Sequence, residues 1–544
     1  MKLFIPILAG IAFICMPVFT VARQAASAAE ATVESAPYGD VIVMGMEVSP
    51  STLISALSTD AASHAVGSKL FTSLLKFDRD LAIVPEAAES YEVLDDGLRL
   101  RFNLRRGIRW SDGNELDLDD VEFTYRFMIS PDTPTAYSGD YKQVKEFRRL
   151  GDWSFEVVYE KPFPRALMSW MMDILPRRAL QGEDLRTSKQ LRNPVGAGPF
   201  QLKSWDSPAM IMLKAAPDYF EGRANLDGVI YRVIRDTSTM FMELKAGKLD
   251  LMSLSNLQYV YRSVEADFAS KFNVYKNLDF SYTFLGYNLR SPLFSDVRVR
   301  KAFALAIDKQ DVVDGALLNQ GLATIGPYRP GGWAYNTRIR DYPRDLGKAG
   351  ELMAEAGWLP GEDGMLYKDG RPFVFTLLVN QGRTERIKTA VILQSQLREL
   401  GVEVKIRVVE WAAFIKEFVH TGYFDALILG WTITQDPDIY DVWHSSRAFK
   451  GGLNFIGYKN AEVDELLEKA RGTFNLEARK QYYDRMQEIL HDEQPYCFLY
   501  VPYSITALNK RFQGVSEAPA GIEHNFIRWW VPQNQQLYRN FLQP

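Results

Sequence analysis

YFDALILGWTITQDPDIYDVWHSS, residues 423–446, changes from apolar to polar within a few positions. Residues 426–429 form an apolar run that is short enough for a strand buried on both faces. The run stops at Gly430-Trp431, and residues 432–438 are turn-forming, with Pro437 preventing a further ladder bond. Ligands bind just beyond the carboxyl ends of strands in open α/β sheets, so this segment predicts a recognition loop. The alternative interpretation is a buried strand that ends in a capped turn.

Strand and helix patterns alternate in the residues that lead to this loop. Residues 373–379, 402–408 and 424–429 have strand character. Residues 385–400 carry apolar side chains at steps of three or four, which predicts a helix, and residues 411–419 are also predicted to be helical. A strand–helix–strand–helix–strand order implies parallel pairing through right-handed crossovers. We therefore expect an α/β fold in this part of the chain.

The first half of the chain contains more hairpin signals. Residues 91–94 and 98–104 alternate in polarity on either side of Asp95-Asp96-Gly97, which predicts a β-hairpin. Residues 117–128 begin with acids that suit a helix N-terminus. Further along, apolar positions at i, i+4, i+7 and i+8 predict one amphipathic helix over residues 296–318.

Length and charge exclude some classes of protein. A chain of 544 residues is too long for one ordinary core, so we expect two or three lobes. The net charge of −5, with no basic stripe interleaved with aromatics, argues against nucleic acid as a partner.

The N-terminus has the pattern of a secretory signal peptide. Lys2 supplies the basic region, residues 3–21 are apolar, and Ala26-Ser27-Ala28 fits a cleavage site. The apolar part would also just suffice for a membrane anchor. Cys15 lies within it, but a lipid attachment site requires a small residue before the cysteine and this chain has Ile14, so we do not expect a lipid anchor.

The mature chain then keeps Cys497 alone, which excludes an intrachain disulfide and a cysteine-based metal site. Its apolar surroundings in the sequence predict a core thiol.

Several ordered motifs point to one family. They are the paired segments 87–93 and 104–113, NPVGAGPF at 193–200, PDYF at 217–220, LKAGKLD at 244–250, and NLRSPLF at 288–294 followed by DVRVRKA at 296–302. Together they resemble the family 5 extracellular solute-binding proteins, which are the peptide, dipeptide and nickel-type receptors of ABC importers. The resemblance runs from about residue 40 to 510.

The resemblance implies an α/β, two-lobed periplasmic binding protein-like fold of class II. The type is the large one, with an extra subdomain and a ligand cleft between the lobes. The implied segments are a signal peptide at 1–28, lobe I at 29–75, its extra subdomain at 76–194, more of lobe I at 195–280, lobe II at 281–504, and a return to lobe I at 505–544.

Candidate ligand-binding residues follow from the same resemblance. Peptide-binding relatives hold the ligand's main chain by backbone groups beside a Gly-Trp pair, which corresponds here to Gly430 and Trp431. Trp411 would face a side-chain pocket, and residues 47–49 would lie on the opposite wall. The full candidate set is Glu47, Ser49, Trp411, Gly430, Trp431, Thr432, Asp436, Tyr500 and Tyr503. For each aromatic residue, a place in the core is the alternative.

The chain departs from the short-peptide receptors at two places. Those receptors carry an aspartate soon after Gly-Trp that pairs with the ligand's α-ammonium, whereas here residues 432–435 separate Trp431 from Asp436. Where some relatives place an arginine before Gly-Trp, this chain has Ile428-Leu429. The differences leave two options, longer peptides held by their main chain or an amine bound by Asp436. Asp436 and Asp438 are alternatively capping residues for the segment that follows.

Enzymatic motifs are absent from the sequence. The five histidines form no zinc-protease helix, and neither a nucleophile elbow nor a nucleotide-binding loop occurs. Together with the signal pattern, the recognition loop and the family resemblance, this leads us to expect a periplasmic, monomeric, non-enzymatic receptor without a cofactor. It would capture oligopeptides by lobe closure and deliver them to an ABC permease served by separate ATPase subunits. The alternatives are the same role with an oligosaccharide, a nickel chelate or another small solute, and an exported hydrolase.

Overall fold

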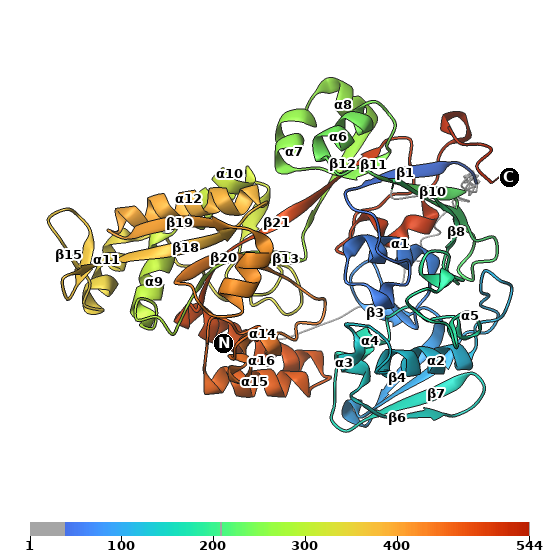
Figure 1. Cartoon of the computed structure of the whole chain (residues 1–544), viewed down its shortest axis with the longest axis horizontal. Coiled ribbons are helices and arrows are strands. Elements are labelled where there is room, and N and C mark those ends of the chain that lie inside the picture. The colour runs from blue at the N-terminus through green and yellow to red at the C-terminus, as the bar shows by residue number, and fades with distance from the viewer. Residues whose placement is uncertain (1–37, 207–208, 543–544) are drawn as a thin grey trace, which may run out of the picture. The chain divides into compact units, whose positions relative to one another are not determined.

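The computed structural model describes residues 38–206 and 209–542 (Figure 1). The predicted signal peptide and Cys15 lie outside the described residues. Within the described part of the chain, a 12-stranded mixed sheet runs in the order β19-β18-β20-β13-β21-β11-β1-β10-β9-β8, with β12 and β14 also paired to β21. A separate four-stranded sheet has the order β4-β5-β7-β6.

The strands of the large sheet are β1 (Val41–Met46), β8 (Phe200–Asp206), β9 (Met210–Ala215), β10 (Gly228–Val233), β11 (Leu251–Ser253), β12 (Phe272–Leu278), β13 (Ser281–Tyr287), β14 (Gly321–Ala323), β18 (Val374–Asn380), β19 (Glu403–Val409), β20 (Ala426–Thr432) and β21 (Tyr496–Asn509). The other strands are β2 (Leu75–Phe77), β3 (Ile83–Pro85), β4 (Ala88–Leu94), β5 (Arg99–Leu104), β6 (Val144–Arg149), β7 (Ser154–Tyr159), β15 (Leu359–Pro360), β16 (Leu366–Lys368) and β17 (Arg371–Pro372).

The α-helices are α1 (Ala61–Leu70), α2 (Leu118–Ile129), α3 (Ser138–Tyr141), α4 (Ala166–Ser169), α5 (Arg177–Leu180), α6 (Thr237–Lys245), α7 (Asn256–Arg262), α8 (Ala266–Lys271), α9 (Val297–Ala306), α10 (Lys309–Leu317), α11 (Leu346–Glu355), α12 (Thr384–Glu399), α13 (Trp411–Ala413), α14 (Tyr440–Trp443), α15 (Ala461–Arg471) and α16 (Leu476–Glu493). A π-helical turn, Phe414–Val419, continues from α13.

Strand β21 joins two groups of strands (Figure 1). Its first half pairs with β13 and its second half with β11 and β12. The hydrophobic cores divide in the same way. The buried residues of two clusters all lie within 282–501, whereas those of the other two lie within 42–272 and 505–531. The chain therefore builds two sets of cores that share one long strand.

The α/β pattern before the recognition loop is confirmed. Strand β18 pairs in parallel with β19 and with β20, and α12 connects β18 to β19. The predicted stop of the last strand at Gly430-Trp431 is wrong, because β20 continues to Thr432. These residues pair with the antiparallel neighbour β13, with Trp431 opposite Tyr282. Pairing with a distant strand outweighs the local turn preference.

The predicted single helix over residues 296–318 is two helices. Helix α9 ends at Ala306, Ile307 has an extended backbone, and α10 begins at Lys309. The Asp308 carboxylate accepts the amide hydrogens of Gln310 and Asp311, so it caps the second helix. The cap breaks the helix within a pattern that otherwise suits one continuous helix.

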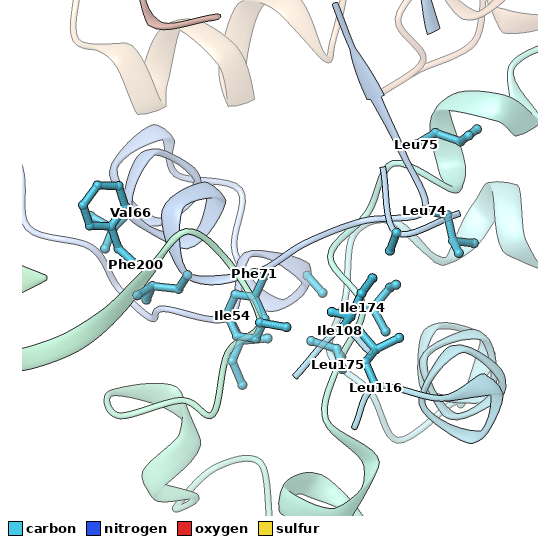
Figure 2. Packing of buried hydrophobic residues seen from close by; sticks show 14 of the residues in the cluster. Ile54, Val66, Phe71, Leu74, Leu75, Ile108, Leu116, Ile174, Leu175 and Phe200 are labelled. Carbon is cyan, nitrogen blue, oxygen red and sulfur yellow. The ribbon is translucent and has the colours of Figure 1, made fainter. Parts of the chain in front are cut away.

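The hairpin predicted in the first half is confirmed as β4 and β5, which belong to the four-stranded sheet. Helix α2 begins with a capping box between Asp117 and Asp120. Beside it, Ile108, Leu116, Ile174 and Leu175 gather into one apolar group (Figure 2). These four residues belong to the largest hydrophobic core cluster of the described residues.

The glycines of the NPVGAGPF motif allow the chain to approach the end of α1. The Gly198 amide donates to the Leu70 carbonyl oxygen at 2.8 Å. A Cβ at Gly196 would lie 2.1 Å from that oxygen, and one at Gly198 would lie 2.5 Å from the Leu70 carbonyl carbon. The motif therefore has a packing role, in agreement with its interpretation as a turn and not a phosphate-binding loop.

Asp173 gives a testable pH dependence. Burial raises its pKa to about 6, although a hydrogen bond from Ser55 and the charge of His64 act in the opposite direction. The folded-state pKa then exceeds the unfolded value of about 3.9, so the stability that protonated Asp173 contributes is present below about pH 4 and lost as the pH rises through about 6.

We expect Asp173→Asn to remove this loss. The free-energy difference between variant and wild type should shift in favour of the variant by about 2 kcal/mol between pH 4 and pH 7. Urea unfolding at both pH values measures it, with the exposed Asp152→Asn as the control. An unchanged difference at the two pH values would contradict the prediction.

Candidate functional site

Two adjoining pockets lie on either side of the loop that leaves β20. The Trp431 pocket, of about 180 Å³, is lined by Trp431, Thr432 and Asp436 among others. The Trp333 pocket, of about 320 Å³, includes Trp333 and Arg329. Four residues line both pockets, namely Tyr328, Ile433, Thr434 and Pro437. The loop is therefore the common wall of the two pockets.

Both sets of cores contribute to these walls. Arg165, from the segment next to the four-stranded sheet, lines the Trp431 pocket. Asp80, Leu81 and Pro519 line the Trp333 pocket together with residues of the loop. The site therefore lies where segments far apart in the sequence meet, which is the expected position for a ligand cleft between lobes.

Trp431 is held in place by aromatic neighbours. Its ring stacks on Phe455 with 6.0 Å between centroids and 29° between planes. Its indole Nε1 donates to the Tyr496 hydroxyl at 3.5 Å. Trp431 therefore packs on the core and also presents part of its surface to the pocket. It has both the core position and the pocket-lining position that the sequence left as alternatives.

Gly430 leaves no space for a side chain. A Cβ there would lie 2.8 Å from the Tyr282 carbonyl oxygen and 2.7 Å from Nη2 of Arg386. Arg386 comes from the first turn of α12 and donates from Nη1 to Asn380 Oδ1 at 2.9 Å. Burial lowers the pKa of Arg386. The chain thus lacks an arginine just before Gly-Trp, but another helix places a guanidinium beside it.

Sequence reasoning missed Arg386 for a physical reason. It lies among other charged residues at the start of a helix, and nothing in that pattern distinguishes a solvated arginine from one that folds toward a distant strand. Only the pairing of β18 with β20 brings it to Gly430.

Of the roles left open for Asp436, binding of the ligand's amine is disfavoured by its contacts in the structure. Its two carboxylate oxygens accept from Nη1 and Nη2 of Arg479, both at 3.0 Å. The side chains are 10% and 4% exposed, so this is a buried bidentate ion pair. The carboxylate also accepts the amide hydrogen of Asp438 at 2.9 Å. Asp436 therefore anchors the loop, although it lines the Trp431 pocket.

Asp438 fits the capping alternative. Its carboxylate accepts the Tyr440 amide hydrogen at 3.2 Å, at the start of α14, and pairs with Nε of Arg471 at 2.8 Å.

The other candidates lie apart from the Trp431 pocket lining. Glu47 is exposed and Ser49 is partly exposed, both just after β1. Trp411 is 49% exposed and stacks on Phe414 at 6.1 Å. Tyr503 is half-buried, with the Lys276 ammonium 4.5 Å from its ring centroid.

Tyr500 does not fit a binding role in this structure. Its side chain is 2% exposed and belongs to a core cluster. Burial raises its pKa, and its hydroxyl receives a hydrogen bond of 3.5 Å from Thr389. Of the predicted set, the structure brings together Gly430, Trp431, Thr432 and Asp436.

The search for metal sites and membrane spans covers residues 38–206 and 209–542. No group of three or more metal-ligating side chains occurs there. None of the helices in that part is both long and apolar enough to span a bilayer. Cys497 is buried in the core, as predicted, and burial raises the pKa of its thiol to about 11.

Comparison with known proteins identifies the family. Residues 82–451 match the model of the bacterial extracellular solute-binding proteins, family 5 Middle. The chain belongs to this family. This family 5 protein is 35% identical over 528 residues to the oligopeptide-binding protein AppA of Bacillus subtilis, covering 94% of this chain and 95% of AppA. It is 27% identical to heme-binding protein A of Haemophilus influenzae, covering 87% of this chain and 88% of the relative.

Solved structures agree with this assignment. AppA from Bacillus subtilis in complex with a nonapeptide superposes with a TM-score of 0.74 at 32% identity, covering 92% of this chain and all of AppA. NikZ from Campylobacter jejuni in complex with Ni(L-His) gives a TM-score of 0.76 at 27% identity, covering 90% of this chain and 99% of NikZ. The predicted family and the two-lobed α/β binding-protein fold are confirmed. These relatives are named for what they bind and not for a reaction.

Proposed function

We propose that this family 5 protein captures oligopeptides outside the cytoplasm and delivers them to an ABC importer. The observation that carries the proposal is a free strand edge beside the Trp431 pocket. Strand β20 pairs with β18 through residues 426–428 only, whereas its pairing with β13 continues to Thr432. Within the described residues, no strand lies against the other edge of residues 430–432.

A free edge of this kind supports main-chain recognition. An extended peptide can add to it as a further strand, with backbone hydrogen bonds supplying affinity and pockets receiving alternate side chains. Trp431 and Thr432 at this edge line the Trp431 pocket, so a peptide added here would lie beside it. Recognition by main chain is independent of sequence, which favours peptides of loosely specified composition. The similarity to AppA, solved with a nonapeptide, supports the same ligand class.

Binding alone accounts for the proposed role. Closing the lobes around a peptide would change the surface that a permease recognises, and no covalent step is required. The chain would act as an exported monomer, without a cofactor, and separate ATPase subunits would supply the energy. The family description as extracellular proteins and the signal-like residues 1–28 support export.

Trp431→Ala tests the position of the site. We expect it to weaken the binding of a neutral Ala/Gly/Ser nonapeptide about thirtyfold, since a central aromatic contact contributes about 2 kcal/mol. Isothermal titration calorimetry measures the affinity, and circular dichroism checks that the variant stays folded.

Trp153→Ala is the matched control, because Trp153 is a half-buried tryptophan next to the four-stranded sheet. It should leave the affinity unchanged. Equal affinities for wild type and Trp431→Ala would remove Trp431 from the site.

A further inference from the structure

Arg329 lies in the Trp333 pocket without an anionic partner. Its guanidinium lies over the Phe280 ring, 4.4 Å from the centroid, and its Nη1 donates to the Pro519 carbonyl oxygen at 3.3 Å. Its Nε is buried and has no hydrogen-bond partner among the residues that the structure describes. An unsatisfied buried donor on a cation is costly unless a ligand completes it.

The surrounding charges do not neutralise this arginine. Burial lowers the pKa of Arg329, and the charge of Asp279 acts in the opposite direction. The two Asp279 oxygens accept from the Phe280 amide at 2.8 Å and from the Ser281 hydroxyl at 2.9 Å. Asp80 also lines the pocket, but its side chain is 66% exposed and lies 3.6 Å from Arg79.

Arg329 differs in this respect from the arginines around the neighbouring pocket. Four of them pair with carboxylates at 3.1 Å or less, in the pairs Arg165–Asp140, Arg447–Asp441, Arg471–Asp438 and Arg479–Asp436. No carboxylate of the described residues forms such a pair with Arg329. Of the two arginines that line these pockets, Arg165 and Arg329, only Arg329 is therefore without a carboxylate partner among the described residues.

The pocket is shaped for a side chain or chain end of a peptide. Phe280, Tyr328 and Trp333 give it aromatic walls, and its volume of about 320 Å³ accommodates one such group. The Tyr328 hydroxyl donates to the Pro437 carbonyl oxygen at 2.9 Å, which ties the Arg329 segment to the recognition loop. A group in this pocket would thus lie next to a peptide held at residues 430–432.

We propose that Arg329 is a specificity-determining residue that binds a carboxylate of the ligand in the Trp333 pocket. This inference rests on the proposed peptide-binding function. The carboxylate belongs either to an acidic side chain or to the peptide's C-terminus. Both present two oxygens to the guanidinium that lines the pocket.

Calorimetric titration with matched peptides tests this inference. The probe is the neutral Ala/Gly/Ser nonapeptide, with Glu or Gln placed at each position in turn, and each peptide as free acid and as C-terminal amide. For wild type we expect one Glu peptide to bind about tenfold to a hundredfold more tightly than its Gln counterpart, or the free acid to do so relative to the amide.

Arg329→Gln should abolish that preference and leave the affinity for the neutral amide within about twofold, because uncharged peptides make no use of the guanidinium. Arg340→Gln, which removes an exposed arginine outside the pocket, should retain the full preference. A preference at one internal position identifies a side-chain carboxylate, and a preference for the free acid identifies the C-terminus.

Two results overturn the inference. One is equal binding of acidic and neutral peptides by wild type, and the other is a preference that persists in Arg329→Gln. In both cases the neutral peptide still binds, so the proposed function stands. If wild type binds none of the peptides, the proposed function itself fails.

Discussion

Replacing Arg511 by methionine is expected to destabilise the protein by about 3–5 kcal/mol, the cost of breaking a buried ion pair. Arg511 donates from Nε and Nη2 to Asp250 at 2.9 and 2.7 Å, and also pairs with Asp40. Both carboxylates are almost fully buried, at 3% and 0% exposure for their residues. The substitution leaves two buried acids without their cation.

The cluster also joins distant parts of the chain. Arg511 Nη2 donates to the Val41 carbonyl oxygen at 2.9 Å, and Asp250 accepts the Val43 amide hydrogen at 2.9 Å. The residues just after β21 and just before β11 are thereby bonded to β1. Chemical denaturation measures the loss, and Arg79→Met, which removes an exposed ion pair, should cost less than about 1 kcal/mol.

The pH dependence of the variant provides a second check. Burial raises the pKa of Asp250, and Arg511 opposes that shift. Without Arg511 the folded-state pKa rises further above the unfolded value, so the variant should recover part of its stability as the pH falls toward about 4. A loss no larger than that of Arg79→Met would contradict the structural role of this cluster.

Asp436→Ala is expected to have a similar effect on stability and a larger one on binding. It leaves the buried Arg479 guanidinium without its carboxylate, at a cost of about 3–5 kcal/mol, and it releases the loop that separates the two pockets. Binding of free and N-acetylated peptides should weaken equally, because the carboxylate positions the loop and does not receive the ligand's amine.

Two further variants isolate the ion pair. Asp441→Ala removes a partly exposed pair with Arg447 and should cost less than about 1 kcal/mol. The double variant Asp436→Leu/Arg479→Met should recover most of the lost stability, since no charge stays buried. If Asp436→Ala keeps full stability and weakens only peptides with a free N-terminus, Asp436 binds the ammonium and our assignment is wrong.

Local sequence patterns predicted the elements whose residues contact one another over short stretches. The apolar run at 426–429 became the buried part of β20, and the turn at Asp95-Asp96-Gly97 joined β4 to β5. Where β20 ends depended on β13, a strand far away in the sequence. Periodicity across residues 296–318 suited one helix, and the Asp308 cap that divides it has little influence on such a pattern.

Contacts with distant residues also limited what the sequence could predict about the site, and to a greater degree. Gly430 and Trp431 were found because their motif is contiguous, whereas Arg386 and Arg479 reach the loop from other helices. A charge at the surface of a helix and a charge that turns inward have the same sequence signal. The sequence therefore left the role of Asp436 open between amine binding and capping, and Arg329 was not singled out at all.

Mass spectrometry of the molecules released by denaturation, after purification from the native host, tests the central claim most directly. We predict a mixture of short peptides with varied side chains, since a free strand edge recognises main chain. A single non-peptide species, such as a saccharide, a heme or a nickel chelate, would contradict peptide capture as the function of this cleft.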